Sequence, residues 1–444
     1  MPLSSDDARA TPSRRSALLI IAMIVAGFGL TLLVFYPGVM TYDAKFVYED
    51  IAKGLRGDWQ SPVMTSLWAL IDPIAPGSAS IFLLIVTMYW LGFGLLALAL
   101  ARRSVGPAFA LLLLALSPPA LVLVGIIWRD VLFADAWLLA AALTFIIADR
   151  GVGLRVPMQA IALGLLALGV LLRPNALIAA PILAAYILWP TQFSCKRATI
   201  LFVPAAVGLF ALVQVVYYGM LGATRQNPLQ SIMVFDLGGI SHFTKQNQYP
   251  VTWSDAETQL LLNGCYKPTE WDIYWRLEPC QFVMHRLEAG EKLFGTPALT
   301  AAWARAVTRH PIAYLQHRAA FMWNFLSRAN LTLWTHDLDD ASKLPLAGRP
   351  AFVALVAIDS ALKPTPLLRA GPWLLVCLAV CAIGWRRRDT PAGAFAIGVC
   401  GSAAIYVLTF FSVGVASDFR YAYWAVLAGI SGTVVVAMRP SAAA

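Results

Sequence analysis

The chain has 444 residues, of which 59% are hydrophobic and only 13% are charged, and its mean hydropathy is +0.70. A soluble globular protein carries about twice that share of charged residues, so composition excludes an ordinary soluble enzyme or binding domain. The formal net charge of +9 does not indicate binding to nucleic acid, because no soluble segment interleaves basic residues with aromatic ones. The positive charge instead reports membrane topology and attraction to anionic lipid headgroups.

Long apolar runs recur along the whole chain, and about 20 such residues cross the hydrocarbon core of a bilayer. The first run, 16–37, is too long for the apolar part of a signal peptide and lacks a small-residue cleavage site, so it predicts an anchor. The sequence therefore predicts an all-α polytopic membrane protein. We place ten spans near 16–36, 80–100, 106–127, 131–148, 157–172, 175–190, 198–221, 368–385, 391–414 and 421–438.

Two other apolar segments, 312–330 and 350–364, are interrupted by charge or proline. Each is either a further span or a helix lying at the interface, so the expected total is ten to twelve. The chain then divides into an N-terminal transmembrane module (1–221), a mainly helical loop region (222–349) and a C-terminal transmembrane module (350–444).

The basic residues predict the orientation, because short loops rich in Lys and Arg stay in the cytoplasm. They fall in alternate short loops: Arg14 and Arg15, Arg102 and Arg103, Arg150 and Arg155, Lys196 and Arg197, Arg386, Arg387 and Arg388, and Arg439. The other loops then face outward. In a bacterial inner (plasma) membrane, the localisation we expect, the outward side is the periplasm, and it carries most of the polar chemistry.

Two cysteines, Cys265 and Cys280, lie in the long outer loop, whereas the other four lie in or beside predicted spans. An oxidising periplasm allows the loop pair to form a disulfide. The alternative is that both are buried thiols. We favour the disulfide because of the compartment and the pairing.

The first outer loop begins with Tyr42-Asp43 and continues into a segment, 44–55, whose apolar residues repeat at helical spacing. That pattern predicts an amphipathic helix lying along the membrane surface. After Gly57-Asp58-Trp59 and Gln60-Ser61-Pro62, a second short apolar segment leads towards the next span. We therefore expect two juxtamembrane helices within 43–72, with Asp43 where the first span leaves the membrane.

These residues resemble the GT-C membrane glycosyltransferases that use polyprenyl-phosphate sugars, which include protein O-mannosyltransferases and lipid A aminoarabinose transferases. An acidic residue just after the first span, a helix, a Gly-Asp-Trp-like turn and a proline before a second helix occur in the same order. Partial matches are Trp128-Arg129-Asp130, Arg173-Pro174-Asn175 and Asp418-Phe419-Arg420-Tyr421. The chain departs from the family at Asp43-Ala44, where an Asp-Glu pair is frequent, and at Gln60-Ser61-Pro62, where Lys-Pro-Pro or His-Pro-Pro is.

The resemblance implies a GT-C-like bundle and a sugar transfer with inversion from a lipid-linked donor, undecaprenyl (polyprenyl) phosphate, to a periplasmic glycan, lipid or protein. Such a transfer needs a carboxylate that takes the acceptor proton and cations that stabilise the departing phosphate. Asp43 is the candidate base, and Arg173 and Arg420 can bind phosphate bidentately. Asp130 can complete an acidic pair with Asp43 for an acceptor or for a divalent cation, Mg²⁺ or Mn²⁺. The other substrate-binding candidates are Arg129, Asn175, Tyr421 and Trp59.

Each assignment has a structural alternative. Asp43 can cap the juxtamembrane helix, and Asp130 can cap the fourth span or pair with Arg129. The arginines can be interfacial anchors whose charges reach the headgroups.

Second-tier candidates are Asp58, Asp418 and Asp135, the last about one turn inside the fourth span, where an ionisable group is a functional candidate. In the long loop, Trp253, Trp271 and Trp275 can stack on sugar rings, although such residues in a small domain are usually core.

Two other functions remain open. A flippase or transporter of lipid-linked saccharides would carry charges near the middle of its spans and a repeat between its halves, whereas here most charges lie at the outer ends of spans. A polysaccharide polymerase or ligase would place its key arginines in a large late loop. The acidic first loop favours the transferase.

Overall fold

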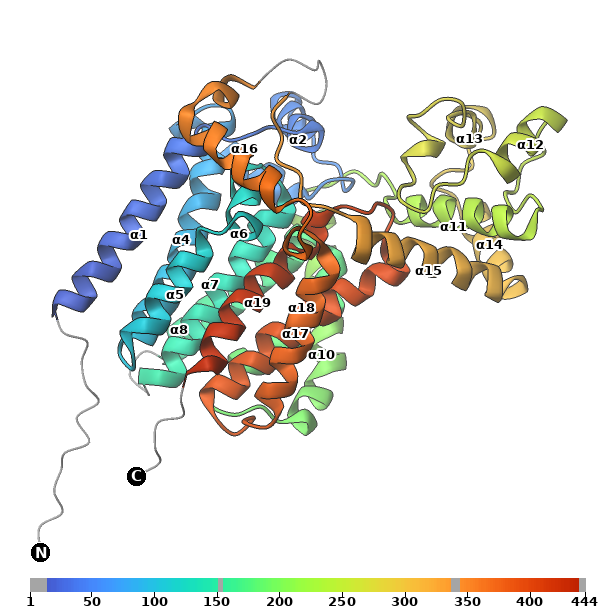
Figure 1. The fold of residues 1–444 in the computed structure, drawn as a ribbon. Coiled ribbons are helices and arrows are strands. Elements are labelled where there is room, and N and C mark those ends of the chain that lie inside the picture. The colour runs from blue at the N-terminus through green and yellow to red at the C-terminus, as the bar shows by residue number, and fades with distance from the viewer. Residues whose placement is uncertain (1–13, 151–154, 337–343, 439–444) are drawn as a thin grey trace, which may run out of the picture.

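The computed structural model describes residues 14–150, 155–336 and 344–438. Within these ranges the chain forms nineteen α-helices, and its strand-like pairings are isolated bridges rather than named strands. The prediction of an all-α polytopic protein is confirmed. Most of the helices run side by side in one bundle, from which a smaller group of helices projects at one end (Figure 1).

Seven helical segments of the described chain are long and apolar enough to cross a membrane. They are α1 (Arg14–Phe35), α4 (Ser78–Ala101), α7 (Arg129–Arg150), α8 (Arg155–Leu172), α10 (Cys195–Gln214) with its π-helical continuation η5 (Val215–Met220), α18 (Pro391–Val413), and η10 (Phe419–Ala422) with α19 (Tyr423–Ala437).

The predicted third span is broken in two. α5 (Val105–Ala115) is followed by α6 (Pro118–Leu121) and η2 (Val122–Gly125), with a bend of 62° between the pieces. Pro118 and Pro119 cause the break, because proline has no N–H to donate and its ring clashes with the preceding turn. The carbonyls near the break are satisfied by tyrosines: Tyr89 donates to Ala115 at 2.5 Å and Tyr423 to Ala120 at 2.6 Å. Counted as one span, the pair brings the total to eight.

The expected number of spans was ten, and the difference lies in two shorter helices. The predicted span at 175–190 is η4 (Pro174–Ile178) followed by α9 (Ala180–Leu188), and the one at 368–385 is η9 (Pro366–Leu368) followed by α17 (Ala370–Trp385). Of the segments left open, 350–364 forms α16 (Pro350–Leu362), which at about 1.5 Å per residue is too short to span a bilayer. It packs against the end of α1, where Phe352 meets Phe35.

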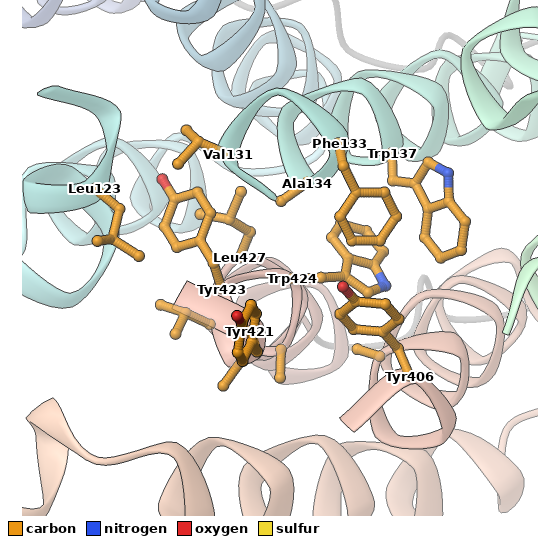
Figure 2. Packing of buried hydrophobic residues seen from close by; sticks show 14 of the residues in the cluster. Leu123, Val131, Phe133, Ala134, Trp137, Tyr406, Tyr421, Tyr423, Trp424 and Leu427 are labelled. Carbon is orange, nitrogen blue, oxygen red and sulfur yellow. The ribbon is translucent and has the colours of Figure 1, made fainter. Parts of the chain in front are cut away.

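The centre of the bundle is formed by α7 and α19, which bury most of their residues, whereas α10 buries almost none. Aromatic side chains fill the space between α7 and α19 (Figure 2). Trp137 of α7 packs edge-on against Trp424 of α19, and Phe133 packs against Trp137 and Tyr406 of α18. Such rings bury large apolar areas and prefer edge-to-face contact. They fix how α7, α18 and α19 lie relative to one another.

Two short helices lie at one end of the bundle, as expected for 43–72. α2 (Tyr42–Lys53) begins after Thr41 and ends at Gly54, whose φ of 66° is the left-handed conformation that closes many helices. α3 (Pro62–Ile71) begins with Ser61, whose hydroxyl accepts from the Met64 N–H, and a proline in its first turn. Because α2 begins at Tyr42, Asp43 lies in its first turn, and its side chain faces the bundle.

A helical extension, residues 229–328, projects from the bundle at the α2 end (Figure 1). Cys265 and Cys280 form a disulfide within it. Segment 312–330, which the sequence left open as either a further span or an interfacial helix, largely forms the long helix α15. The helices are α11 (Leu229–Thr244), α12 (Asp255–Asn263), η6 (Asp272–Tyr274), α13 (Phe282–His285), η7 (Arg286–Gly290), α14 (Pro297–Arg309) and α15 (Pro311–Arg328), and η8 (Pro345–Gly348) follows later in the chain.

The extension is anchored to the bundle where α18 ends. Arg318 of α15 donates to the Gly414 carbonyl at 2.6 Å, and its charge is balanced by Asp236 at 2.7 Å. Burial raises the pKa of Asp236, but the hydrogen bond from His317 and the charge of Arg318 outweigh it and leave that pKa below its usual value. An unpaired charge buried at this depth would be costly, so the Asp236–Arg318 pair is what allows the anchor.

The basic loops gather at the opposite end of the bundle. Arg387 donates to the Val436 carbonyl, Arg388 accepts through its carbonyl from Phe193, and Arg103 lies over the Phe145 ring. Contacts of this kind connect loops that the sequence predicted to share one side of the membrane.

We therefore expect a reporter fused after Arg103 or Arg388 to be cytoplasmic and one inserted within 264–275 to be exported. The physical reason is that the two sets of loops lie at opposite ends of the bundle, and loops rich in Lys and Arg are expected to stay in the cytoplasm. Paired alkaline phosphatase and green fluorescent protein fusions measure this directly. An exported Arg388 fusion would reverse the orientation.

Candidate functional site

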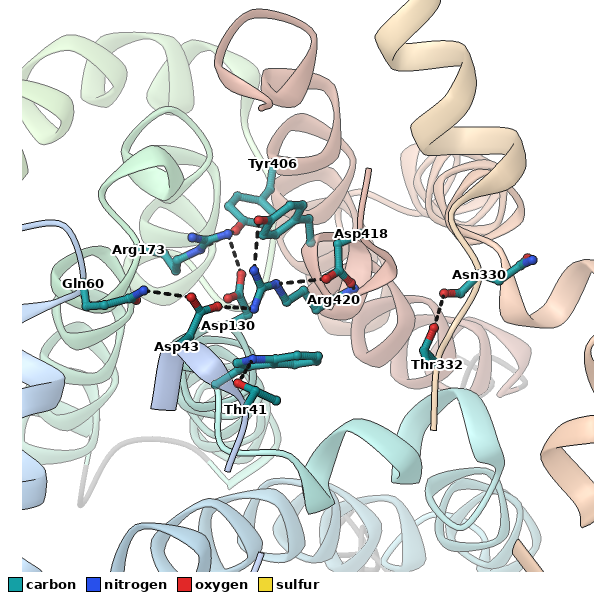
Figure 3. Close-up of polar contacts among 12 residues, drawn as sticks. Thr41, Asp43, Gln60, Asp130, Arg173, Asn330, Thr332, Tyr406, Asp418 and Arg420 are labelled. Carbon is teal, nitrogen blue, oxygen red and sulfur yellow. Dashed lines mark hydrogen bonds and ion pairs between the residues drawn. The ribbon is translucent and has the colours of Figure 1, made fainter. Parts of the chain in front are cut away.

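Charged side chains from four distant segments converge at the α2 end of the bundle (Figure 3). Asp43 comes from α2, Arg129 and Asp130 from the first turn of α7, Arg173 from the turn after α8, and Asp418 and Arg420 from the segment that leads into α19. We call these six residues the arginine–aspartate cluster. Three carboxylates therefore face three guanidinium groups, so the cluster is close to electrically neutral.

Asp43 is bound through both carboxylate oxygens. Arg420 Nη1 lies 2.5 Å from Oδ2, and Gln60 Nε2 donates to Oδ1 at 3.1 Å. The side chain remains 33% exposed, so it is reachable. It does not cap α2: the N-cap is Thr41, no side-chain cap bond is formed there, and the Thr41 hydroxyl accepts from the Trp128 indole at 2.7 Å. The capping alternative is therefore not what the structure shows.

The acidity of Asp43 is set by opposed effects. Burial raises the pKa of Asp43. The charge and hydrogen bond of Arg420, with smaller contributions from Arg129 and Arg173, lower the pKa by more than burial raises it, so the pKa lies below its usual value. A carboxylate held in this way is ionised at neutral pH. It is in the protonation state that a proton acceptor requires.

Asp130 and Arg173 form the most deeply buried pair of the cluster. Arg173 Nη2 lies 2.5 Å from Asp130 Oδ1, and the two side chains are only 10% and 4% exposed. Arg173 also donates to the Tyr406 hydroxyl at 3.4 Å, and Asn175 is a second neighbour of that hydroxyl. Arg173 is thus held inside the bundle rather than reaching out to headgroups.

Aromatic rings separate the guanidinium groups. Tyr421 lies between two of them, with Arg173 4.9 Å and Arg420 5.1 Å from its ring centroid, and its hydroxyl accepts from Arg420. Arg420 also lies 4.6 Å from the Trp128 ring. The negative face of each ring attracts the cations. Asp418 completes the arrangement, because it caps η10 and contacts Arg420 Nε at 3.3 Å.

Arg129 differs from the other two arginines. Its Nη1 donates to the Trp59 carbonyl at 3.1 Å, and within the described part of the chain no carboxylate lies at salt-bridge distance from it. A guanidinium has five N–H donors, so most of its capacity is unused. Arg129 also lines a small open pocket with Asp43, Gln60 and Asp130. It is the cation of the cluster best placed to receive an added anion.

Two second-tier residues lie outside the cluster. Asp58 accepts from Tyr218 at 2.8 Å and from the backbone of Gln226 at 2.6 Å, which ties the first loop to the end of η5. Asp135 is fully buried further along α7, and both of its oxygens lack a hydrogen-bond partner. Neither is brought next to Asp43.

Metal binding by Asp43 and Asp130 stays a prediction. Each of these carboxylates is already paired with an arginine. No group of three or more His, Cys, Asp or Glu suited to a metal ion occurs among the described residues.

Sequence reasoning did not assign a role to Gln60 or Tyr406, which contact the cluster, or to Thr41, which binds the neighbouring Trp128. Gln60 was visible as a departure from the family pattern, and its place beside Trp59 was a usable signal. Tyr406 lies in an apolar span and carried none.

Comparison with known proteins yields no match: no family model, no curated protein and no solved structure resembles the chain closely enough to place it. The function must therefore be inferred from the site itself.

The buried pair gives a stability prediction. We expect Arg173→Ala to destabilise the protein by about 3–5 kcal/mol, because it leaves the buried Asp130 carboxyl without the cation that it pairs with. Thermal unfolding of the purified protein in detergent measures the loss.

Two controls separate this cause from general damage. Arg173→Met combined with Asp130→Leu removes both charges and should cost less than Arg173→Ala alone. Lys53→Ala breaks a pair whose side chains are 59% and 65% exposed and should change stability by less than about 1 kcal/mol. A double variant as unstable as the single one would contradict the electrostatic explanation.

Proposed function

We propose that the protein is an inverting glycosyltransferase of the bacterial inner membrane, which moves a sugar from a polyprenyl-phosphate donor to an acceptor on the periplasmic side. The observation that carries the proposal is a partly exposed carboxylate, Asp43, lying among the arginines of the arginine–aspartate cluster at the α2 end of the bundle. Base and phosphate-binding groups are the two requirements of this transfer, and here they lie side by side.

In the proposed reaction, Asp43 is the general base. The acceptor hydroxyl oxygen forms a bond to C1 of the sugar while the bond from C1 to the phosphate oxygen breaks. The electron pair leaves with polyprenyl phosphate, and the hydroxyl proton passes to Asp43. Attack from the face opposite the leaving group inverts the configuration at C1.

The arginines stabilise the leaving group. Transfer converts a phosphodiester with one negative charge into a phosphate monoester with nearly two, so added cationic stabilisation is worth most in the transition state. Arg129 has free donors for this charge. Arg420 can turn towards the phosphate from Asp43, and that exchange would restore the basicity of the carboxylate when the donor is bound.

We expect a lipid-linked donor because the cluster lies at the α2 end of the bundle, next to α2 and α3, which the sequence predicts to lie along the membrane surface. Nucleotide sugars are cytoplasmic, so a transferase that faces the periplasm draws its sugar from a lipid carrier. The basic end of the bundle, opposite the cluster, supports that orientation.

Transport of a lipid-linked saccharide is the second candidate function, and Asp135 is the observation that favours it. A fully buried carboxyl without a partner in a span is typical of ion or proton pathways. The same residue is isolated, however, because the other acidic residues of the site lie at the end of the bundle. The arrangement favours chemistry at that end over passage through the middle.

The central prediction concerns Asp43→Asn. Asparagine keeps the shape of the side chain and removes the proton acceptor, which contributes about 10²–10⁴-fold in rate. We expect this variant and Asp43→Ala to insert normally and to fail in sugar transfer. The measurement is glycan and lipid profiling of a deletion strain complemented with each variant, with membrane levels checked by immunoblot.

Asp50→Asn is the matched control, because Asp50 is a largely buried carboxyl on the same helix that lies outside the cluster. It should support transfer at close to the wild-type level. Wild-type transfer by Asp43→Asn would rule out the base and with it the proposed mechanism.

A second prediction follows from the lowered pKa of Asp43. The base is ionised, and therefore active, above its pKa, and Arg420 keeps that pKa low. In Arg420→Gln burial is no longer opposed by that cation, so the pKa of Asp43 rises. We expect the acid limb of the kcat/KM profile to move to higher pH, in addition to a lower plateau. A plateau loss with an unmoved acid limb would show that Arg420 does not act on the base.

A further inference from the structure

One segment of the helical extension reaches the cluster. Residues 269–271 pair with 415–417, just before Asp418: Trp271 N–H donates to the Val415 carbonyl at 2.8 Å, and Ser417 N–H donates to the Thr269 carbonyl at 2.6 Å. The Arg276 guanidinium lies 5.6 Å from the ring of Tyr42, the neighbour of Asp43. This segment, 269–276, therefore borders the site that α2 and η10 form.

Three indole rings lie in a row at this border. Trp59 from the first loop is 5.7 Å from Trp271, and Trp271 is 6.0 Å from Trp275, with ring planes inclined by 40° and 30°. Trp271, in the middle, is 6% exposed, while Trp59 and Trp275 at the two ends are half-buried. Trp253, the other tryptophan considered from sequence, packs on Tyr249 and Phe282 in the core of the extension.

A carboxylate accompanies the row. Asp272 Oδ1 accepts from the Trp275 indole at 3.2 Å, which leaves its second oxygen available. Burial raises the pKa of Asp272, and Asp43 and Arg420 are both near enough to influence it. A half-buried aromatic face and a carboxylate thus lie together on the side of the cluster that the extension forms.

This combination suits a sugar ring. The C–H bonds on one face of a pyranose carry partial positive charge and are attracted to the negative face of an indole, while a carboxylate accepts hydrogen bonds from the ring's hydroxyls. A peptide would instead be expected to use an exposed backbone edge or an apolar groove.

We infer that segment 269–276 is the acceptor subsite and that the acceptor is a saccharide, whose ring stacks on Trp275 while a hydroxyl donates to Asp272. The inference rests on the proposed function, which it deepens by naming the acceptor class. The Cys265–Cys280 disulfide closes the loop that carries the segment, so it holds the subsite in place.

The test uses purified protein in nanodiscs, a radiolabelled polyprenyl-phosphate sugar, and an envelope extract from cells that lack the chain as the acceptor. In Trp275→Ala and Asp272→Asn we expect the extract concentration for half-maximal rate to rise about tenfold, the scale of one lost aromatic or charged contact. The donor KM and the maximal rate should stay within about threefold of wild type. Trp323→Ala, which removes a tryptophan that is 66% exposed on α15, is the matched control and should leave both unchanged.

The chemical class of the acceptor is tested on the same extract. Periodate, which cleaves vicinal diols, should destroy its acceptor activity, and protease digestion should not. The reverse pattern would identify a protein acceptor and overturn the inference, as would an unchanged acceptor dependence in Trp275→Ala. Absence of transfer by the wild-type protein would reject the proposed function and the inference with it, whereas wild-type transfer with insensitive variants would reject the inference alone.

Discussion

The contact between Arg420 and Asp43 organises the α2 end of the molecule. It joins residues that are 377 positions apart and so requires the first loop and the last span to meet. Two charges of this kind are costly to remove from water unless each has a partner, and neighbouring segments contribute to the balance. α7 supplies Asp130, the turn after α8 supplies Arg173, and the residue that caps η10 is Asp418. The aromatic packing between α7, α18 and α19 holds these partners in register. The fold of this end is therefore a consequence of neutralising a cluster of charges inside an apolar bundle.

The sequence was sufficient to predict the fold class and the first-loop helices, because both depend on local patterns. Apolar runs mark spans, helical spacing within 44–55 marks α2, and the short apolar segment that follows Gln60-Ser61-Pro62 marks α3. It was also sufficient to single out the charged residues, since an ionisable group at the end of an apolar run is conspicuous.

The pairing of these charged residues was not predictable. Arg173 and Arg420 were expected to bind phosphate, and both are paired with carboxylates, whereas Arg129 has the free donors. Partnership depends on which span ends adjoin, and that information is tertiary. The number of spans differed because α9 and α17 are shorter than the apolar runs that predicted them.

One short stretch of chain, 414–420, contacts both the extension and the arginine–aspartate cluster. Its first residue accepts from Arg318, its next three pair with 269–271, and its last residue contacts Asp43. A displacement of the extension would therefore be transmitted to Arg420 without passing through the membrane core. Asp236 balances the charge of Arg318, which binds Gly414 at the start of this stretch. Asp236 therefore contributes to the geometry of the cluster although it lies within the extension.

The order of the chain has a consequence for biogenesis. A ribosome delivers Asp43 with the first hairpin and Asp130 soon afterwards, but Arg420 only with the final helix. Until then the first loop carries a carboxylate whose cation has yet to be synthesised. A membrane insertase or a quality-control protease that recognises unpaired charge would encounter it throughout translation, and the last nineteen residues of the spanning region, Phe419–Ala437, would end that exposure. Truncation there should mark the whole chain for degradation.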